Sequence, residues 1–165
     1  MLRYLVVKPA LAPLAFLVVH SQILISSEIG YILFNKLADG ILIDLKDSSN
    51  LALSIFQACN LKSFKPDYIS CPGCGRTLFD IQTTLKNIKE KTKHLSNIKI
   101  AVMGCVVNGI GEMQDADFGY VGSKPNKVDL YAMKNCIERD VDENEAVEKL
   151  IELIKKMNKW DKQLY

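Results

Sequence analysis

The stretch SCPGCGRTLFD, residues 70–80, places two cysteines three positions apart, with a proline and a glycine between them. Cys71 and Cys74 are close enough along the chain for both thiolates to hold one metal centre. The same spacing is typical of a thioredoxin-like dithiol and of half a zinc site. Because a short apolar segment precedes the stretch and a helical pattern follows it, we expect it to join a strand to a helix.

The segments on either side predict how a third cysteine reaches this pair. Residues 68–70 indicate a short strand, and Thr77 with Asp80 fits a capping box at a helix start. Residues 98–104, IKIAVMG, indicate a second buried strand that ends just before Cys105. If the two strands run side by side, all three sulfurs lie at one edge of a sheet.

A glycine-rich loop is predicted after Cys105, over residues 104–117, GCVVNGIGEMQDAD. Gly109 and Gly111 would let the backbone fold closely around a bulky group and point N–H groups at anionic sulfur. Beyond the loop, residues 118–122 and 127–133 predict two strands joined by a turn. A helix is predicted over residues 142–157, with acids in its first turn and lysines near its end.

The N-terminal third alternates between strand and helix patterns. We predict strands over residues 14–19 and 39–45, and helices over 26–38 and 48–61, with Ser26 or Ser27 capping the first helix. Short links between these elements favour a parallel βα arrangement. Two such units cannot close a barrel, so this part is expected to be the tail of a larger domain, followed by a linker at residues 62–67.

Composition and charge exclude several classes of function. The 165 residues carry a net charge of +2 without a dense basic block, so neither nucleic acid nor a membrane surface is expected as a partner. The five cysteines are an odd set, which favours a reducing compartment, and hence the cytoplasm, over a secreted disulfide framework. Lys8, Pro9 and Pro13 interrupt the apolar N-terminus, which argues against a signal peptide.

Spacing alone leaves three readings of the cysteines open. A zinc site needs a fourth ligand, and neither His20 nor His94 has finger-type spacing. A dithiol leaves Cys105 unexplained. An iron–sulfur site uses all three cysteines, and Glu112 could supply a harder, more exchangeable oxygen ligand to a [4Fe–4S] cluster. The other two cysteines, Cys59 and Cys136, are expected to be small core residues.

At this point the sequence resembles a known family. ISCPGCGRTLFD followed by MGCVVNGIGEMQDADFGYVG is similar to the C-terminal part of 4-hydroxy-3-methylbut-2-enyl diphosphate synthases. The resemblance is close over residues 67–155 and continues through KVDLYAMKNCIERDVDENEAVEKLIELI, as in the larger plastid and bacterial forms. The stretch SSEIGYILFNKLADGILIDL shows a weaker similarity to the end of the family's TIM barrel.

The resemblance implies a cofactor and a set of site residues. The family's three cluster cysteines fall on Cys71, Cys74 and Cys105, and its cluster glutamate falls on Glu112. Asn108 matches a family asparagine in the cluster loop, to which we assign a supporting catalytic role. The implied reaction is the reductive ring opening and dehydration of 2-C-methyl-D-erythritol 2,4-cyclodiphosphate in isoprenoid biosynthesis, in which the unique iron binds a substrate oxygen after the carboxylate yields its place.

The resemblance also implies partners and a domain organisation. Ferredoxin or flavodoxin would supply electrons, and the full-length form would be a homodimer in the cytoplasm or the plastid stroma. We expect an α/β chain: residues 1–62 as the remnant of a TIM barrel, 67–158 as a ferredoxin-like, sulfite-reductase-type α+β domain that binds the cluster, and 159–165 as a tail. Most of the barrel, with its diphosphate-binding residues, is absent, so the chain is expected to be a fragment, a split product or part of a complex.

One position departs from the family pattern near the proposed glutamate. Ile110 stands where the family usually has proline. Without the ring, the backbone φ angle at this position is no longer fixed, so the loop should be slightly looser. The change removes no ligand.

Arg76, which follows the cysteine pair, is interpreted in two ways. It either faces the substrate or cluster or is a surface arginine.

Overall fold

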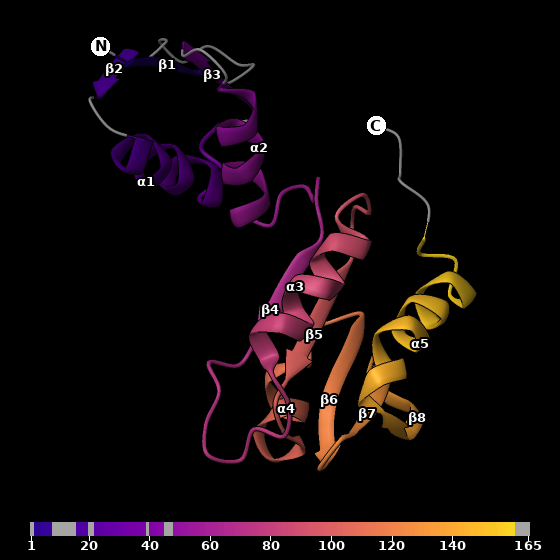
Figure 1. Cartoon of the computed structure of the whole chain (residues 1–165). Helices are drawn as coiled ribbons and strands as arrows, with labels where there is room; N and C mark the ends of the chain where they lie inside the picture. The colour runs from indigo at the N-terminus through magenta and orange to yellow at the C-terminus, as the bar shows by residue number, and fades with distance from the viewer. Residues whose placement is uncertain (1, 8–15, 20–21, 39, 45–47, 161–165) are drawn as a thin grey trace. The chain divides into compact units, whose positions relative to one another are not determined.

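The computed structural model describes residues 2–7, 16–19, 22–38, 40–44 and 48–160. The chain divides into two units, Met1–Phe64 and Lys65–Tyr165, which are treated separately below (Figure 1). Within the described residues, no helix combines the length and the apolar character needed to cross a bilayer.

A mixed five-stranded sheet forms the centre of the C-terminal unit. The strand order follows the sequence, and the bounds are β4 Asp67–Ser70, β5 Lys99–Met103, β6 Phe118–Lys124, β7 Lys127–Ala132 and β8 Asn135–Asp142. The pairs β4–β5 and β5–β6 are parallel, and the remaining two pairs are antiparallel. The predicted side-by-side placement of the strands that precede Cys71 and Cys105 is therefore confirmed.

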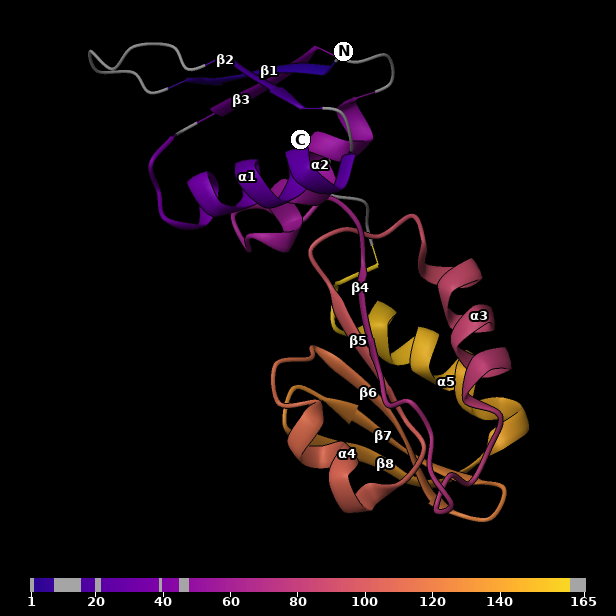
Figure 2. The same ribbon diagram turned by 90° about the vertical axis from the view of Figure 1, so that its left-hand side faces the viewer.

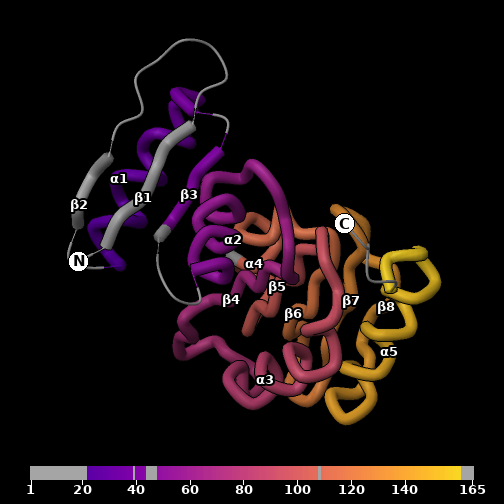
Figure 3. The backbone as a smooth tube through the Cα atoms, turned by 90° about the horizontal axis from the view of Figure 1, so that it is seen from above, coloured from indigo at the N-terminus to yellow at the C-terminus, as the bar shows by residue number. Residues whose placement is uncertain are grey.

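Helices cover both faces of this sheet. Helices α3, Ile81–Thr92, and α5, Glu143–Lys156, lie on one face, and the short helix α4, Val106–Glu112, lies on the other (Figures 2 and 3). Strand alternation explains the two layers, because successive side chains point to opposite faces. Ile100 and Val102 pack in the cluster under α3 and α5, whereas Ala101 and Met103 pack in the cluster that includes Met113, just after α4.

The sequential strand order corrects part of the predicted fold. A ferredoxin-like module interleaves its two βαβ halves, whereas here each strand pairs with its neighbours in sequence. The mixed α/β character holds, but the split arrangement is not present in the described strands. Strand β8 was also missed, because half of its residues are charged, only Val141 among them is buried, and it lies at the sheet edge. Edge strands lack the apolar run by which central strands are recognised.

Two local predictions near the cysteines were wrong. Helix α3 begins after Asp80, whose carboxylate accepts the backbone N–H groups of Gln82 and Thr83, so Asp80 caps the helix and Thr77 does not. The predicted glycine loop contains helix α4. Gly109 lies against Met103 there, and a Cβ at Gly109 would stand 2.8 Å from the Met103 Cβ. The glycine therefore serves close packing within a helix rather than a loop.

The N-terminal unit contains a three-stranded sheet and two helices. Its elements are β1 Leu2–Val7, β2 Phe16–Val19, α1 Gln22–Phe34, β3 Gly40–Asp44 and α2 Ser49–Ala58. The predicted alternation is present in β2–α1–β3–α2. However, β1 lies between β2 and β3 and is antiparallel to both, so the expected neighbouring parallel pair is not formed. An unpaired strand edge readily accepts any available extended segment, and β1 fills that role.

Helix α1 begins four residues earlier than predicted. The hydroxyls of Ser26 and Ser27 donate to the carbonyls of Gln22 and Leu24, so these serines lie inside the helix and do not cap it. Ile25, Ile29 and Leu33 form the buried face, at the spacing of a helix. They pack with Ile43 and Ile55, and Cys59 lies partly buried against this cluster, as predicted for a core residue.

The cap of α3 leads to a testable pH dependence. Hydrogen bonds from the Thr83 side chain, and from the backbone N–H groups of Thr83 and Gln82, lower the pKa of Asp80. Because the folded pKa is depressed, the stabilisation is present above the unfolded value of about 3.9 and is lost as pH falls through the folded pKa. We expect Asp80→Ala to lower the melting temperature by a few degrees at neutral pH.

Asp80→Asn separates the charge from the cap geometry in this experiment. The amide oxygen can still accept both N–H groups, but it does not titrate near pH 4. Thermal melts at several pH values should therefore show a gap between wild type and Asp80→Asn that narrows as pH falls. A gap that is independent of pH would contradict the assignment of the cap to an ionised carboxylate.

Candidate functional site

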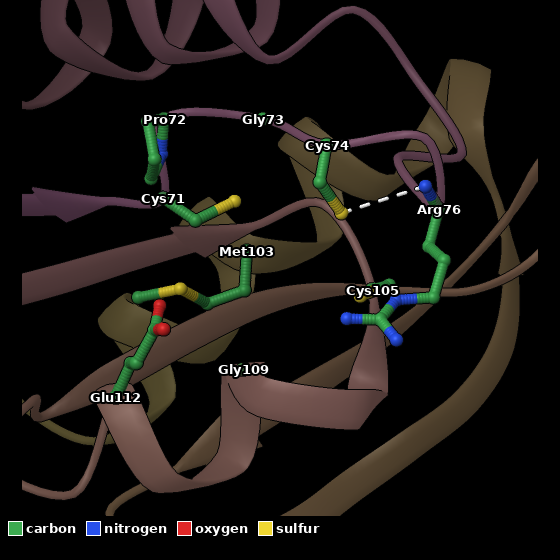
Figure 4. A pocket seen from close by; sticks show the side chains of 9 residues that line it. All are labelled: Cys71, Pro72, Gly73, Cys74, Arg76, Met103, Cys105, Gly109 and Glu112. Carbon is green, nitrogen blue, oxygen red and sulfur yellow. Dashed lines mark hydrogen bonds between the residues drawn. The ribbon is translucent and has the colours of Figure 1, made fainter.

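A cavity of about 140 Å³ opens at the carboxyl edge of the parallel strands in the C-terminal unit. Its wall includes Cys71, Cys74, Cys105 and Glu112, together with Pro72, Gly73, Arg76, Met103 and Gly109 (Figure 4). The three cysteines and the glutamate predicted from the sequence are thus brought to one cavity from three segments: the loop after β4, the end of β5 and helix α4. All five cysteines of the chain carry free thiols.

A tight turn shapes the loop that carries Cys71 and Cys74. The hydroxyl of Thr77 accepts the backbone N–H of Cys74 at 2.9 Å, and the Thr77 N–H donates to the Cys74 carbonyl at 3.0 Å. Gly73 has a φ of +85°, a value that residues with a Cβ rarely adopt. The threonine that the sequence suggested as a helix cap instead closes this turn.

Gly104 joins the two cysteine-bearing segments. Its N–H donates to the Cys71 Sγ at 3.2 Å, and its carbonyl accepts the Leu78 N–H at 3.1 Å. A Cβ at Gly104 would stand 2.9 Å from the Thr77 hydroxyl, and one at Gly122 would stand 2.5 Å from the Gly104 carbonyl oxygen. These close contacts connect the loop after β4, the end of β5 and strand β6 directly, so they determine how far Cys71 lies from Cys105.

Helix α4 sets the positions of Cys105 and Glu112. Cys105 is the residue before the helix and has an extended backbone, while Glu112 ends the helix. In Figure 4 the Glu112 carboxylate points towards Met103 from the wall opposite Arg76. Asn108 also belongs to α4, but its side chain lies outside the described part of the structure, so its predicted supporting role stays a prediction.

Backbone N–H groups provide the electrostatic character of the cavity. The Arg76 N–H donates to the Cys74 Sγ at 3.4 Å. This hydrogen bond lowers the pKa of the exposed Cys74 thiol, and the Arg76 guanidinium lowers it further through its N–H and its positive charge. The donors to sulfur are therefore Gly104 and Arg76 rather than the glycines of α4. The sequence offered no signal for either, because any residue other than proline carries a backbone N–H.

The side chains of the cavity can be compared with the ligands that an iron–sulfur cluster needs. Among the described residues, no three His, Cys, Asp or Glu side chains stand close enough together to share a single metal ion. A four-iron cluster is larger and is bound at its corners, so its ligands surround a cavity instead of meeting at a point. N–H donors to the ligating sulfurs are typical of iron–sulfur sites. Three thiols and one carboxylate around a cavity, with N–H donors to two of the sulfurs, thus form a donor set that fits an iron–sulfur cluster.

Comparison with known proteins identifies the family of the domain that contains this cavity. Residues 67–156 match the family described as GcpE protein C-terminal domain, and the match spans more than half of the chain. The chain belongs to the GcpE family. The matched region begins at β4 and ends with α5, so it contains all the elements that build the cavity.

Curated relatives of the GcpE chain carry the name of one enzyme. The chain is 49% identical over 142 residues to the 4-hydroxy-3-methylbut-2-en-1-yl diphosphate synthase (flavodoxin) of Protochlamydia amoebophila, covering 84% of this chain and 22% of the relative. It is 50% identical over 140 residues to the Chlamydia muridarum enzyme of the same name, covering 82% and 23%. It is 46% identical over 136 residues to the chloroplastic, ferredoxin-type synthase of Arabidopsis thaliana, covering 79% and 18%.

The chain therefore spans less than a quarter of the length of these relatives. The longest of these alignments covers more residues than the C-terminal unit contains, so the similarity extends into the N-terminal unit. The family resemblance expected from the two cysteine-bearing motifs is confirmed. The homology is to the C-terminal domain of an oxidoreductase of isoprenoid biosynthesis.

Proposed function

We propose that the chain is the cluster-bearing part of a 4-hydroxy-3-methylbut-2-enyl diphosphate synthase. The observation that carries this proposal is the single cavity shared by Cys71, Cys74, Cys105 and Glu112 in a member of the GcpE family. The proposed reaction is the reductive ring opening and dehydration of 2-C-methyl-D-erythritol 2,4-cyclodiphosphate. A [4Fe–4S] cluster at this site would supply the electrons and a Lewis-acidic iron.

The cavity offers two kinds of ligand for such a cluster. Three thiolates are soft ligands that bind iron of a cluster tightly, and the sulfurs of Cys71 and Cys74 accept backbone N–H groups. Glu112 is a harder oxygen ligand, which exchanges more readily than a thiolate. The site would thus hold the cluster by three thiolates and by one carboxylate that exchanges more readily. Asn108 is proposed as a supporting residue from α4.

The remaining features of the proposal concern domains and partners. Residues 1–62 would be the end of a TIM barrel, residues 67–158 the sulfite-reductase-type cluster domain and residues 159–165 a tail. The electron donor would be flavodoxin or ferredoxin, which form part of the names of the related enzymes. The rest of the barrel would complete the diphosphate site, the full-length form would be a homodimer, and the protein would act in the cytoplasm or the plastid stroma.

Anaerobic reconstitution tests the cofactor directly. The purified chain is incubated with iron and sulfide, and its iron, sulfide and zinc contents are then measured. We expect iron and sulfide in equal amounts, with the visible absorbance of a [4Fe–4S] cluster. Stoichiometric zinc without sulfide would refute the cluster and favour a structural zinc module.

Glu112→Ala tests the fourth ligand. The three cysteines remain, so we expect the variant to keep most of its iron and sulfide. The iron that has lost its carboxylate should show a changed Mössbauer or paramagnetic resonance signal. An unchanged signal with full cluster content would contradict the role of Glu112. Glu90→Ala, on the exposed surface of α3, serves as the control.

A second candidate is a cluster carrier without catalytic activity. It is favoured for the isolated polypeptide because the chain spans less than a quarter of its relatives. The assay is turnover of the cyclic diphosphate by the reconstituted chain with a reduced flavodoxin or ferredoxin. Turnover by the chain alone would exclude the carrier, and turnover only with added barrel would support the split enzyme.

A further inference from the structure

Arg76 is a residue of the cavity wall to which the proposed reaction gives no role. Its backbone N–H donates to the Cys74 Sγ at 3.4 Å. Its side chain lines the same cavity, and the guanidinium acts on the Cys74 thiol through a hydrogen bond and through its positive charge (Figure 4). One residue thus contacts Cys74 at two points, through its main chain and through its side chain.

The turn before Arg76 holds it in this position. The Thr77 hydroxyl accepts the Cys74 N–H at 2.9 Å, and the Thr77 N–H donates to the Cys74 carbonyl. Arg76 lies between these two bonded residues, so the start of its side chain has little freedom. The residue is exposed and lines the cavity wall. Its side chain can therefore act on the contents of the cavity.

The guanidinium of Arg76 is a positive charge among groups that are neutral or negative. Arg76 is the one basic residue in the described lining, where the other ionisable groups are three thiols and Glu112. None of the four ion pairs between described residues includes Arg76, so no carboxylate among them neutralises it at ion-pair distance. An arginine side chain keeps its positive charge at any pH that a protein tolerates.

We propose that Arg76 is a positioning residue for the cluster: its N–H orients the Cys74 sulfur, and its guanidinium favours the reduced state of the cluster. The inference rests on the proposed function, because it requires a cluster on Cys71, Cys74 and Cys105. Adding an electron makes the cluster more negative. N–H donors to sulfur and a nearby fixed cation stabilise the more negative state, and both raise the reduction potential.

Three variants separate charge, geometry and non-specific effects. Arg76→Gln removes the cation, Arg76→Lys keeps a cation without the planar fork of donors, and Arg139→Gln is a matched control on the exposed part of β8. After reconstitution, reduction potentials are measured by dye-coupled titration. We expect a more negative potential in Arg76→Gln, a smaller shift in Arg76→Lys, and the wild-type value in Arg139→Gln. Cluster loss to a chelator should be about tenfold faster in Arg76→Gln.

Each further outcome decides the proposal. A loaded Arg76→Gln with wild-type potential and wild-type cluster loss would overturn it. If Arg76→Gln takes up no cluster, Arg76→Leu removes the cation instead, and a wild-type potential with wild-type cluster loss in that variant would overturn the proposal. Inorganic pyrophosphate provides a third test: if it perturbs the cluster spectrum of wild type but not of Arg76→Gln, while their potentials agree, the guanidinium binds an oxyanion and the proposal fails. A wild-type chain that takes up no cluster refutes the proposed function, not the role of Arg76.

Discussion

Replacement of Cys105 with serine is expected to reduce the retained cluster at least about tenfold. Cys105 is the only ligand of the proposed set that comes from the end of β5, so its loss leaves the cluster without a thiolate on that side of the cavity. A serine hydroxyl has nearly the same shape but is a poor ligand for cluster iron. Iron and sulfide contents after anaerobic reconstitution and desalting provide the measurement.

Two other cysteines of the chain provide matched controls for this experiment. Cys59 lies in the N-terminal unit beside the cluster of Ile25, Ile29 and Leu33, and Cys136 lies on β8. Neither lines the cavity. Cys59→Ser and Cys136→Ser should therefore keep the iron and sulfide content of wild type. If either control lost the cluster as completely as Cys105→Ser, the assignment of the three ligands would be wrong.

Gly122→Ala is expected to destabilise the C-terminal unit by about 1–3 kcal/mol. The new Cβ would stand 2.5 Å from the Gly104 carbonyl oxygen, which belongs to the backbone and cannot rotate away. Strand β6 or the end of β5 must shift, and Gly104 carries the N–H that contacts the Cys71 Sγ. The variant should therefore lose both folding stability and cluster content.

Denaturant unfolding followed by tryptophan fluorescence measures the first effect. Trp160 is the only tryptophan of the chain, and its ring packs edge-on against His94, so it reports on the C-terminal unit. Gly111→Ala is the control, since no atom lies within 4 Å of a Cβ at that position. It should leave stability unchanged or slightly raised, because alanine is the better helix former. Equal stability of Gly122→Ala and wild type would contradict the close packing described for Gly104.

The sequence predicted the C-terminal unit well where apolar periodicity was strong. The strands around Ile69, Ile100 and Val128 and the helix around Leu150 follow from their patterns, and the turn at Pro125 and Asn126 follows from residue preference. The gathering of Cys71 and Cys105 at one edge also follows, because parallel strands end at the same edge of a sheet.

What the sequence could not reveal depends on contacts between distant segments. Thr77 satisfied a helix-cap pattern, but the Cys74 N–H competes for its hydroxyl and Asp80 takes over the cap. Gly109 suggested a loop, but it lies in a helix, where the absence of a side chain allows close packing against Met103. Strand β1 was also missed, and its antiparallel pairing with β3 joins segments that are far apart in the sequence. None of these outcomes is encoded in local propensity.

The two outer strands of the five-stranded sheet bear on association between copies. Strand β4 is short, four residues, and offers little backbone for pairing. Strand β8 is twice as long, but Glu138 and Asp140 on it form ion pairs with Lys149 and Lys124. Charged edges oppose the addition of a further strand from a neighbouring molecule. The sheet is thus protected against edge-to-edge aggregation at both edges, by the short length of β4 on one side and by the charged side chains of β8 on the other.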